Sequence, residues 1–113
     1  MALIYKICPQ GLWSEAEAKG AFDGSTVDKR DGYIHFSSAE QLKGTAAKHF
    51  GGLDDLLLIA VDDQKLGAAL KWEPSRGGAL FPHLYAVLDL TDISWVKSLP
   101  LGNDGIHHFP PLD

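Results

Sequence analysis

Two short stretches of this chain combine histidine, tyrosine and serine at spacings that suit a binding site. The first, Asp31 to Ser38 (DGYIHFSS), places a histidine on a short β-type segment. Because alternate residues of a strand point to one face, Tyr33, His35 and Ser37 form a polar stripe. A buried polar side chain needs a partner. His35 is therefore either a core histidine bonded to backbone and hydroxyl groups, or a donor to a ligand hydroxyl or phosphate.

The second stretch, residues 72–85, holds a basic side chain beside glycines (WEPSRGGALFPHLY). Arg76 followed by Gly77 and Gly78 can present a guanidinium group and backbone amides to a phosphate or carboxylate. The alternative is an ordinary loop arginine paired with a nearby acid. Glu73 is a candidate catalytic carboxylate, and a structural ion pair is its other interpretation.

The same stretch offers further candidates for the lining of a pocket. His83 and Tyr85 are two residues apart and share a strand face, which is also consistent with a half-exposed sheet surface. Ser75 is either a turn residue or a pocket hydroxyl, and Trp72 is either a packing anchor or an aromatic wall. We expect His35 and the Arg76 loop to face one solvent-accessible cleft.

The overall composition limits the classes of partner. A formal charge of −5, with one adjacent basic pair, argues against general nucleic-acid binding, although a local cationic site remains compatible with it. The longest apolar run, residues 56–61, is too short to cross a bilayer. A single cysteine, Cys8, excludes an intrachain disulfide, and with no leader-like segment it favours a cytoplasmic location. We predict no metal site, because paired C-x-x-C and H-E-x-x-H motifs are absent and the adjacent histidines at 107 and 108 lack further ligands.

The order of predicted elements indicates a single α+β domain spanning 1–113. Two short helices are expected in the N-terminal half: one starting at a capping box formed by Ser14 and Glu17, and one over 39–50. Residues 23–31 are expected to form a surface loop, and residues 100–113 an extended tail. The predicted strands cover residues 2–8, 33–37, 56–61, 70–73, 84–90 and 93–99.

These motifs, taken together with Ile4-Tyr5-Lys6-Ile7 and the strand 56–62, resemble the bacterial domain-of-unknown-function family nine-five-two. That resemblance implies an ADP-ribosyltransferase-like fold, in which a small split mixed or antiparallel sheet surrounds an NAD-type cleft. Residues 34–37 (IHFS) are similar to a strand of the RNA 2′-phosphotransferases. By that likeness His35 lies near a nicotinamide ribose or a phosphate, Ser37 supports the pocket, and NAD is the implied cofactor. Tyr5 stands where those enzymes have histidine or arginine, and Glu73 is the candidate for their glutamate.

The sequence thus predicts a cleft for a nucleotide or another small molecule that bears an anionic group. If the protein is an enzyme, transfer from NAD is the implied reaction, with Glu73 stabilising a cationic sugar and Tyr85 or Trp72 flanking a base. The alternative is a non-enzymatic module that binds a metabolite or a protein. A third interpretation makes both polar clusters buried structural networks, and the oligomeric state is left open.

Overall fold

The computed structural model describes residues 2–113, which form an α+β fold of small antiparallel sheets and short helices. The strands are β1 (Leu3–Pro9), β2 (Ala21–Phe22), β3 (Ile34–His35), β4 (Leu56–Asp62), β5 (Leu70–Pro74), β6 (Leu80–Leu84), β7 (Leu88–Asp89) and β8 (Ile93–Leu99). The α-helices are α1 (Gln10–Lys19), α2 (Thr26–Asp31) and α3 (Leu42–His49), and 3₁₀ turns cover Ala39–Gln41, Asp63–Ala69, Arg76–Gly78 and Leu90–Asp92.

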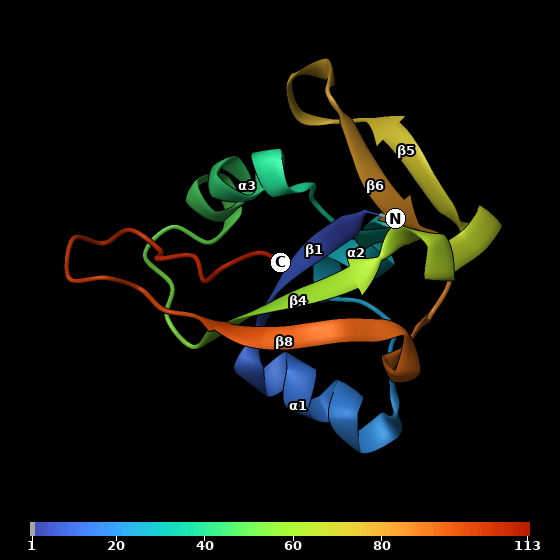
Figure 1. Cartoon of the computed structure of the whole chain (residues 1–113), viewed down its shortest axis with the longest axis horizontal. Coiled ribbons are helices and arrows are strands. Elements are labelled where there is room, and N and C mark those ends of the chain that lie inside the picture. The colour runs from blue at the N-terminus through green and yellow to red at the C-terminus, as the bar shows by residue number, and fades with distance from the viewer. Residues whose placement is uncertain (1) are drawn as a thin grey trace.

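The central sheet has the order β1-β4-β8, with both pairs antiparallel. Helix α1 lies against one face of this sheet, and α3 with the C-terminal segment lies on the other (Figure 1). The middle strand β4 is apolar from Leu56 to Val61 because it is covered on both faces, as its uninterrupted hydrophobic run predicts. β8 alternates between partly buried and exposed residues, and it confirms the strand predicted for 93–99.

The second sheet has the order β3-β6-β5 and is joined to the first by the segment that follows β3. Ile34 and His35 pair with β6, whereas Ser37 pairs with Tyr5 of β1 through two backbone hydrogen bonds of 2.8 Å. Between them, Phe36 N donates to the carbonyl of Pro82 at 3.0 Å. Residues 34–37 therefore pass from one sheet to the other.

Three helices, rather than the two predicted, form in the described part of the chain. The additional helix is α2, in the segment 23–31 that was predicted to be a loop. Ser25 accepts from the amide of Asp28, and the Asp28 carboxylate accepts from the amide of Ser25, so a capping box starts this helix. The predicted start of α1 was wrong as well, because the helix begins at Gln10 and the Ser14 hydroxyl donates back to the Gln10 carbonyl.

Two predicted strands also differ: the strand over 33–37 is limited to β3, and a second difference lies in the last third of the chain. The strand predicted over residues 84–90 is wrong: β6 ends at Leu84, and only Leu88 and Asp89 return as β7. The predicted helix 39–50 is confirmed as a 3₁₀ turn leading into α3, with Ser38 and Gln41 forming the capping box at its start.

The C-terminal segment packs on the face of the central sheet that bears Tyr5. The Tyr5 hydroxyl donates to the carbonyl of Leu112 at 2.7 Å, and His107 Nε2 donates to the carbonyl of Leu53 at 2.7 Å. Phe109 and Leu112 add to the hydrophobic cluster there. Across residues 2–113, no helix combines the length and the apolar character needed to span a membrane.

Candidate functional site

A cleft of about 660 Å³ lies where the two sheets meet. Its lining comes from β1, from the segment 35–37 and from β6, with α2 and α3 contributing further residues and Ser75 reaching it from the β5–β6 connection. This volume is within the range of small-molecule sites. The described lining residues include Lys6, Asp28, Arg30, Asp31, His35, Ser37, Thr45, Lys48, His49, Phe50, Ser75, Phe81 and His83.

His35 is held in the cleft by a carboxylate at each ring nitrogen. Its Nδ1 lies 2.6 Å from Asp28 Oδ1, and its Nε2 lies 3.0 Å from Asp31 Oδ2. The backbone N–H of His35 also donates to Asp28 Oδ1 at 3.1 Å. Since a carboxylate only accepts hydrogen bonds, both ring contacts are hydrogen bonds when the imidazole carries both protons. Asp28 thus fixes both the position and the orientation of the ring.

Asp28 itself is buried, and a lysine from the neighbouring strand compensates its charge. Only 2% of the Asp28 side chain is exposed, and Lys6 Nζ lies 3.0 Å from its Oδ2. Burial raises the pKa of Asp28, but the hydrogen bond from His35 and the charge of Lys6 outweigh it and hold this pKa well below its usual value. Lys6 Nζ also donates to the carbonyl of His35 at 2.9 Å. Asp28 is therefore a fixed anion beneath His35.

A second carboxylate–histidine pair lies on β5 and β6. His83 Nδ1 donates to Glu73 Oε1 at 2.9 Å, and the Tyr85 hydroxyl donates to the same oxygen at 2.7 Å. The bonds from Tyr85 and His83 lower the pKa of Glu73, and the bond to Glu73 raises the pKa of Tyr85 to about 12. Only 3% of the His83 side chain is exposed, and its Nε2 has no hydrogen-bond partner among the described residues.

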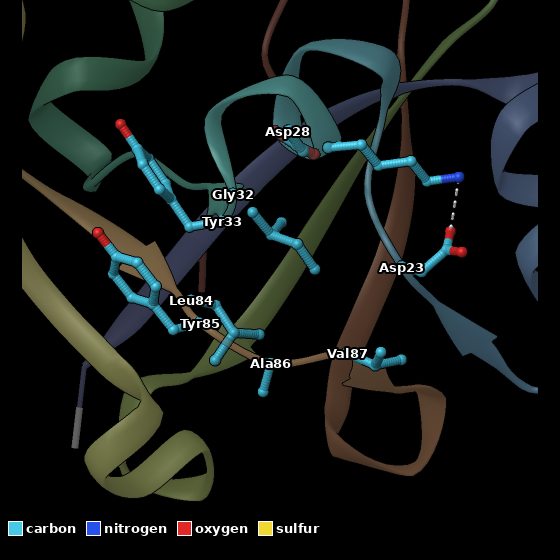
Figure 2. Close-up of a pocket in the computed structure, with 10 residues that line it drawn as sticks. Asp23, Asp28, Gly32, Tyr33, Leu84, Tyr85, Ala86 and Val87 are labelled. Carbon is cyan, nitrogen blue, oxygen red and sulfur yellow. Dashed lines mark ion pairs between the residues drawn. The ribbon is translucent and has the colours of Figure 1, made fainter.

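The two histidines face each other in the register of β3 and β6, with ring centroids 5.5 Å apart. Tyr33 lies over both rings, at 4.6 Å from His35 and 4.1 Å from His83, and 5.2 Å from Tyr85. Figure 2 shows the Tyr33 and Tyr85 rings side by side with their hydroxyls turned the same way. They also line a smaller hollow of about 300 Å³ between α2 and residues 84–87.

Helix α3 supplies hydroxyl and cationic groups on the opposite side of the cleft. Thr45 Oγ1 donates to the Gln41 carbonyl at 3.1 Å, which leaves the Ser37 hydroxyl as the donor in their 2.9 Å contact. Lys48 and His49, in the last turn of this helix, are exposed.

The described lining carries three permanent cations, from Lys6, Arg30 and Lys48, against two carboxylates, from Asp28 and Asp31. Three histidines add to the cationic side of this balance when protonated. In a chain with a formal charge of −5, the cleft is thus locally favourable to an anion.

The structure brings only part of the predicted site together. His35, Ser37, Ser75 and His83 line the large cleft, whereas Tyr33 and Tyr85 line the smaller hollow. Glu73 is linked to the cleft only through His83.

The prediction that the Arg76 guanidinium faces the cleft falls on a side chain outside the described part of the structure, while its two glycine neighbours can be placed. The backbone of Arg76–Gly78 forms a 3₁₀ turn. Gly77 and Gly78 are exposed and lie outside the large cleft, and the amide of Gly78 already donates to the Ser75 carbonyl at 2.8 Å. Trp72, with 42% of its surface exposed, also lies outside the cleft.

Sequence reasoning missed the acidic residues that hold His35. Asp28 and Asp31 lie in the segment predicted to be a loop, and Lys6 lies within an apolar strand. A signal for Asp28 was present, because Ser25 and Asp28 have the spacing of a capping box. The contact of Lys6 with Asp28 joins β1 to α2 and has no comparable local signal.

Two further features bear on the chemistry of the site. Among residues 2–113, no cluster of three or more His, Cys, Asp or Glu side chains has the arrangement of a metal site. Burial raises the pKa of the Cys8 thiol to about 11, although the charge of Lys6 lowers it in part. Cys8 lines the cleft as a neutral thiol at physiological pH.

The chain is similar to one protein family model and to solved structures. Residues 7–96 match the model for a protein of unknown function, DUF952. The crystal structure of CC0527 from Caulobacter crescentus is similar, with a TM-score of 0.90 and 49% identity over 94% of this chain and 93% of that one. The solution NMR structure of CC0527 has a TM-score of 0.85 and 50% identity over 94% of this chain and 91% of that one. Comparison with curated proteins gives no match.

Proposed function

The chain belongs to the DUF952 family, and from its cleft we propose that it binds a small molecule of nucleotide size that bears a phosphate or carboxylate group. The observation that carries this proposal is the cleft of about 660 Å³ in which His35 is fixed by Asp28. The same cavity could hold a neutral metabolite of similar size. The surplus of cationic side chains in its lining favours an anion.

Different residues of the cleft bind the anionic group, attract it and line the wall. An anionic group of the ligand takes the place of the Asp31 carboxylate at His35 Nε2, because Asp31 is 30% exposed and Arg30, whose Nε lies 3.1 Å from Asp31 Oδ1, still compensates its charge when that contact is lost. Lys48 attracts the anion from the rim, and the hydroxyls of Ser37, Thr45 and Ser75 line the wall. Asp28 keeps the ring of His35 in place throughout, since its carboxylate is buried.

NAD is the ligand to test first, because residues 34–37 (IHFS) resemble a strand of the RNA 2′-phosphotransferases. The chain passes from one sheet to the other at residues 34–37, beside the cleft, and this interruption of the sheet supports an ADP-ribosyltransferase-like fold as the basis for testing NAD. In the transferase version, His35 bonds a ribose hydroxyl and Glu73 stabilises the cationic sugar after nicotinamide leaves. Glu73 must then exchange its bonds with His83 and Tyr85 for a contact with the sugar.

The binding proposal is tested by titration calorimetry with NAD, ADP-ribose and nucleoside monophosphates and diphosphates at low salt. We expect Lys48→Glu to weaken binding by roughly tenfold, because reversing one charge at about 4 Å in water changes the energy by about 2 kcal/mol at most. Lys43→Glu is the matched control: the same change at an exposed residue of the same helix, outside the cleft, leaves binding unchanged. If none of these ligands binds at millimolar concentration, the proposal is wrong.

A non-enzymatic binding module is the second candidate, and the position of Glu73 favours it. Two hydrogen bonds from the protein occupy one carboxylate oxygen, and the residue lies outside the cleft lining. Release of nicotinamide from NAD separates the two candidates. A transferase loses that activity in Glu73→Ala while still binding NAD, whereas a binding module releases none in either form.

A further inference from the structure

We propose that His83 contacts the ligand as well: its Nε2 accepts a hydrogen bond from a ligand hydroxyl that lies close to the anionic group bound by His35. This inference rests on the proposed function and specifies the ligand class of the same cleft. It predicts a phosphorylated sugar, in which a hydroxyl and a phosphate lie within one sugar unit.

The chemistry of the His83 ring follows from its partner. Glu73 is an ionised carboxylate, so it can only accept, and His83 Nδ1 must carry the proton that joins them at 2.9 Å. In the neutral ring, Nε2 is then a bare acceptor. Tyr85 donates to the same Glu73 oxygen and so restrains the carboxylate in this position.

Nε2 is left without a partner among the described residues. Buried polar atoms in folded proteins nearly always have a hydrogen-bond partner, and an unpaired one costs free energy. The His83 side chain is 3% exposed and belongs to the lining of the large cleft. Less than 1 Å² of the Nε2 surface is exposed, so a donor from the cleft reaches it when a neighbouring side chain shifts, and a ligand hydroxyl is a donor small enough to do so.

The position of His83 relative to His35 narrows the class of ligand. The two rings are 5.5 Å apart on paired strands, and Tyr33 lies over both, so their relative placement is rigid. One ligand that touches both rings must therefore present an acceptor for His35 and a donor for His83 a few ångströms apart. A ribose phosphate has this arrangement, whereas pyrophosphate has no sugar hydroxyl.

The test compares ADP-ribose with pyrophosphate by calorimetry on wild type and two variants of His83. The side chain of His83→Asn retains a group near Nδ1, so it keeps the contact with Glu73 but removes the acceptor at Nε2. His83→Gln places its amide oxygen near the Nε2 position and restores an acceptor. We expect His83→Asn to weaken ADP-ribose binding about tenfold with pyrophosphate unchanged, and His83→Gln to recover most of the loss.

The role of Glu73 as a positioning residue has its own measurement. ¹⁵N NMR of the His83 ring reports which nitrogen carries the proton, with or without ligand. We expect the Nδ1–H form in the wild type and a mixture of tautomers in Glu73→Ala. Tyr85→Phe is the control, because it leaves the bond between Glu73 and His83 in place.

Each outcome has one interpretation. If wild type binds none of NAD, ADP-ribose and the nucleoside phosphates, the proposed function fails and this inference fails with it; if it binds a nucleoside phosphate but not ADP-ribose, only this inference is wrong. If ADP-ribose and pyrophosphate both bind but His83→Asn weakens them equally, or changes neither, only this inference is wrong. Equal weakening of both ligands would make His83 a structural residue, and no weakening would mean that Nε2 does not contact the ligand.

Discussion

Replacement of Asp28 by asparagine tests whether this carboxylate holds the site together. The two oxygens of Asp28 accept from four groups: the amides of Ser25 and His35, the His35 ring and the Lys6 ammonium. Asparagine has one acceptor oxygen, so its amide group would face the Ser25 N–H and Lys6, both of which are donors. Asp28→Asn therefore leaves a buried ammonium uncompensated and a helix cap incomplete.

The expected cost follows from these losses. Breaking a buried ion pair by removing one partner costs about 3–5 kcal/mol. We expect the total cost to stay within this range although the helix cap is weakened too, because the same carboxylate makes both interactions and their contributions overlap. For a chain of this size, such a loss lowers the melting temperature by on the order of 10–20 °C. Urea unfolding followed by far-UV circular dichroism, with thermal melts in parallel, measures it.

Asp31→Asn is the matched control, because Asp31 bonds the other nitrogen of the same imidazole but is exposed. We expect it to lower the free energy of unfolding far less than Asp28→Asn does, because its contacts with Arg30 and His35 are exposed. If Asp28→Asn unfolds with the same midpoint as Asp31→Asn, the reasoning about the buried carboxylate is refuted.

The dependence on pH gives an independent check of Asp28. Its pKa in the folded chain is lowered from the usual 3.8, so its stabilisation is complete above about pH 4 and is lost as the pH falls through the folded pKa. The difference in unfolding free energy between wild type and Asp28→Asn should therefore shrink as the pH is lowered from 5 toward 2. A difference that stays constant over this range would contradict the assignment.

Three further predictions concern single side chains. Because burial raises the pKa of Cys8 to about 11, iodoacetamide at pH 8 should label it slowly in the native protein and rapidly in urea, as mass spectrometry would show; fast native labelling would contradict its burial. Glu73→Gln should bring the pKa of Tyr85 down from about 12 toward 10, seen as an earlier rise in absorbance at 295 nm on alkaline titration. Gly32 ends α2 at φ 90°, so Gly32→Ala should cost about 1 kcal/mol, while Gly11→Ala, inside α1 with open space around it, should not destabilise; equal effects would remove this argument.

Local sequence signals predicted most of the central sheet and the helix over 39–50. β4 is recognisable because a strand covered on both faces is apolar throughout, and β8 because it alternates. The short helix α2 was missed because its six residues carry little hydrophobic periodicity, so only its capping box marks it. The strand predicted over 84–90 was placed too late in the sequence. The observed strand β6 contains Pro82, and a proline lacks the N–H that a strand interior needs, so the sequence gives no strand signal over 80–84.

The candidate site was predictable in its residue types but not in its connections. The pairing of His35 with His83 depends on the register of β3 and β6, strands that are distant in the sequence. The partner of His35 depends on α2, and the compensating charge comes from Lys6 on β1. Glu73 illustrates the converse: its residue type suggested catalysis, whereas its place on β5 directs it to His83 and Tyr85.

The buried ion pair of Lys6 and Asp28 could serve either the stability of the fold or the positioning of His35, and substitutions can separate these two roles. Exchanging a buried ion pair for apolar residues of similar size is often neutral or stabilising, so stability alone does not explain its presence beneath His35. We infer that the pair serves to hold the imidazole toward the cleft. The double variant Lys6→Met/Asp28→Leu should therefore unfold with a midpoint closer to wild type than Asp28→Asn does, yet bind ADP-ribose at least about tenfold more weakly by calorimetry, since His35 loses its bonds at both the ring and the amide. A double variant that is stable and binds as well as wild type would show that the network contributes packing only, and that the orientation of His35 is set elsewhere.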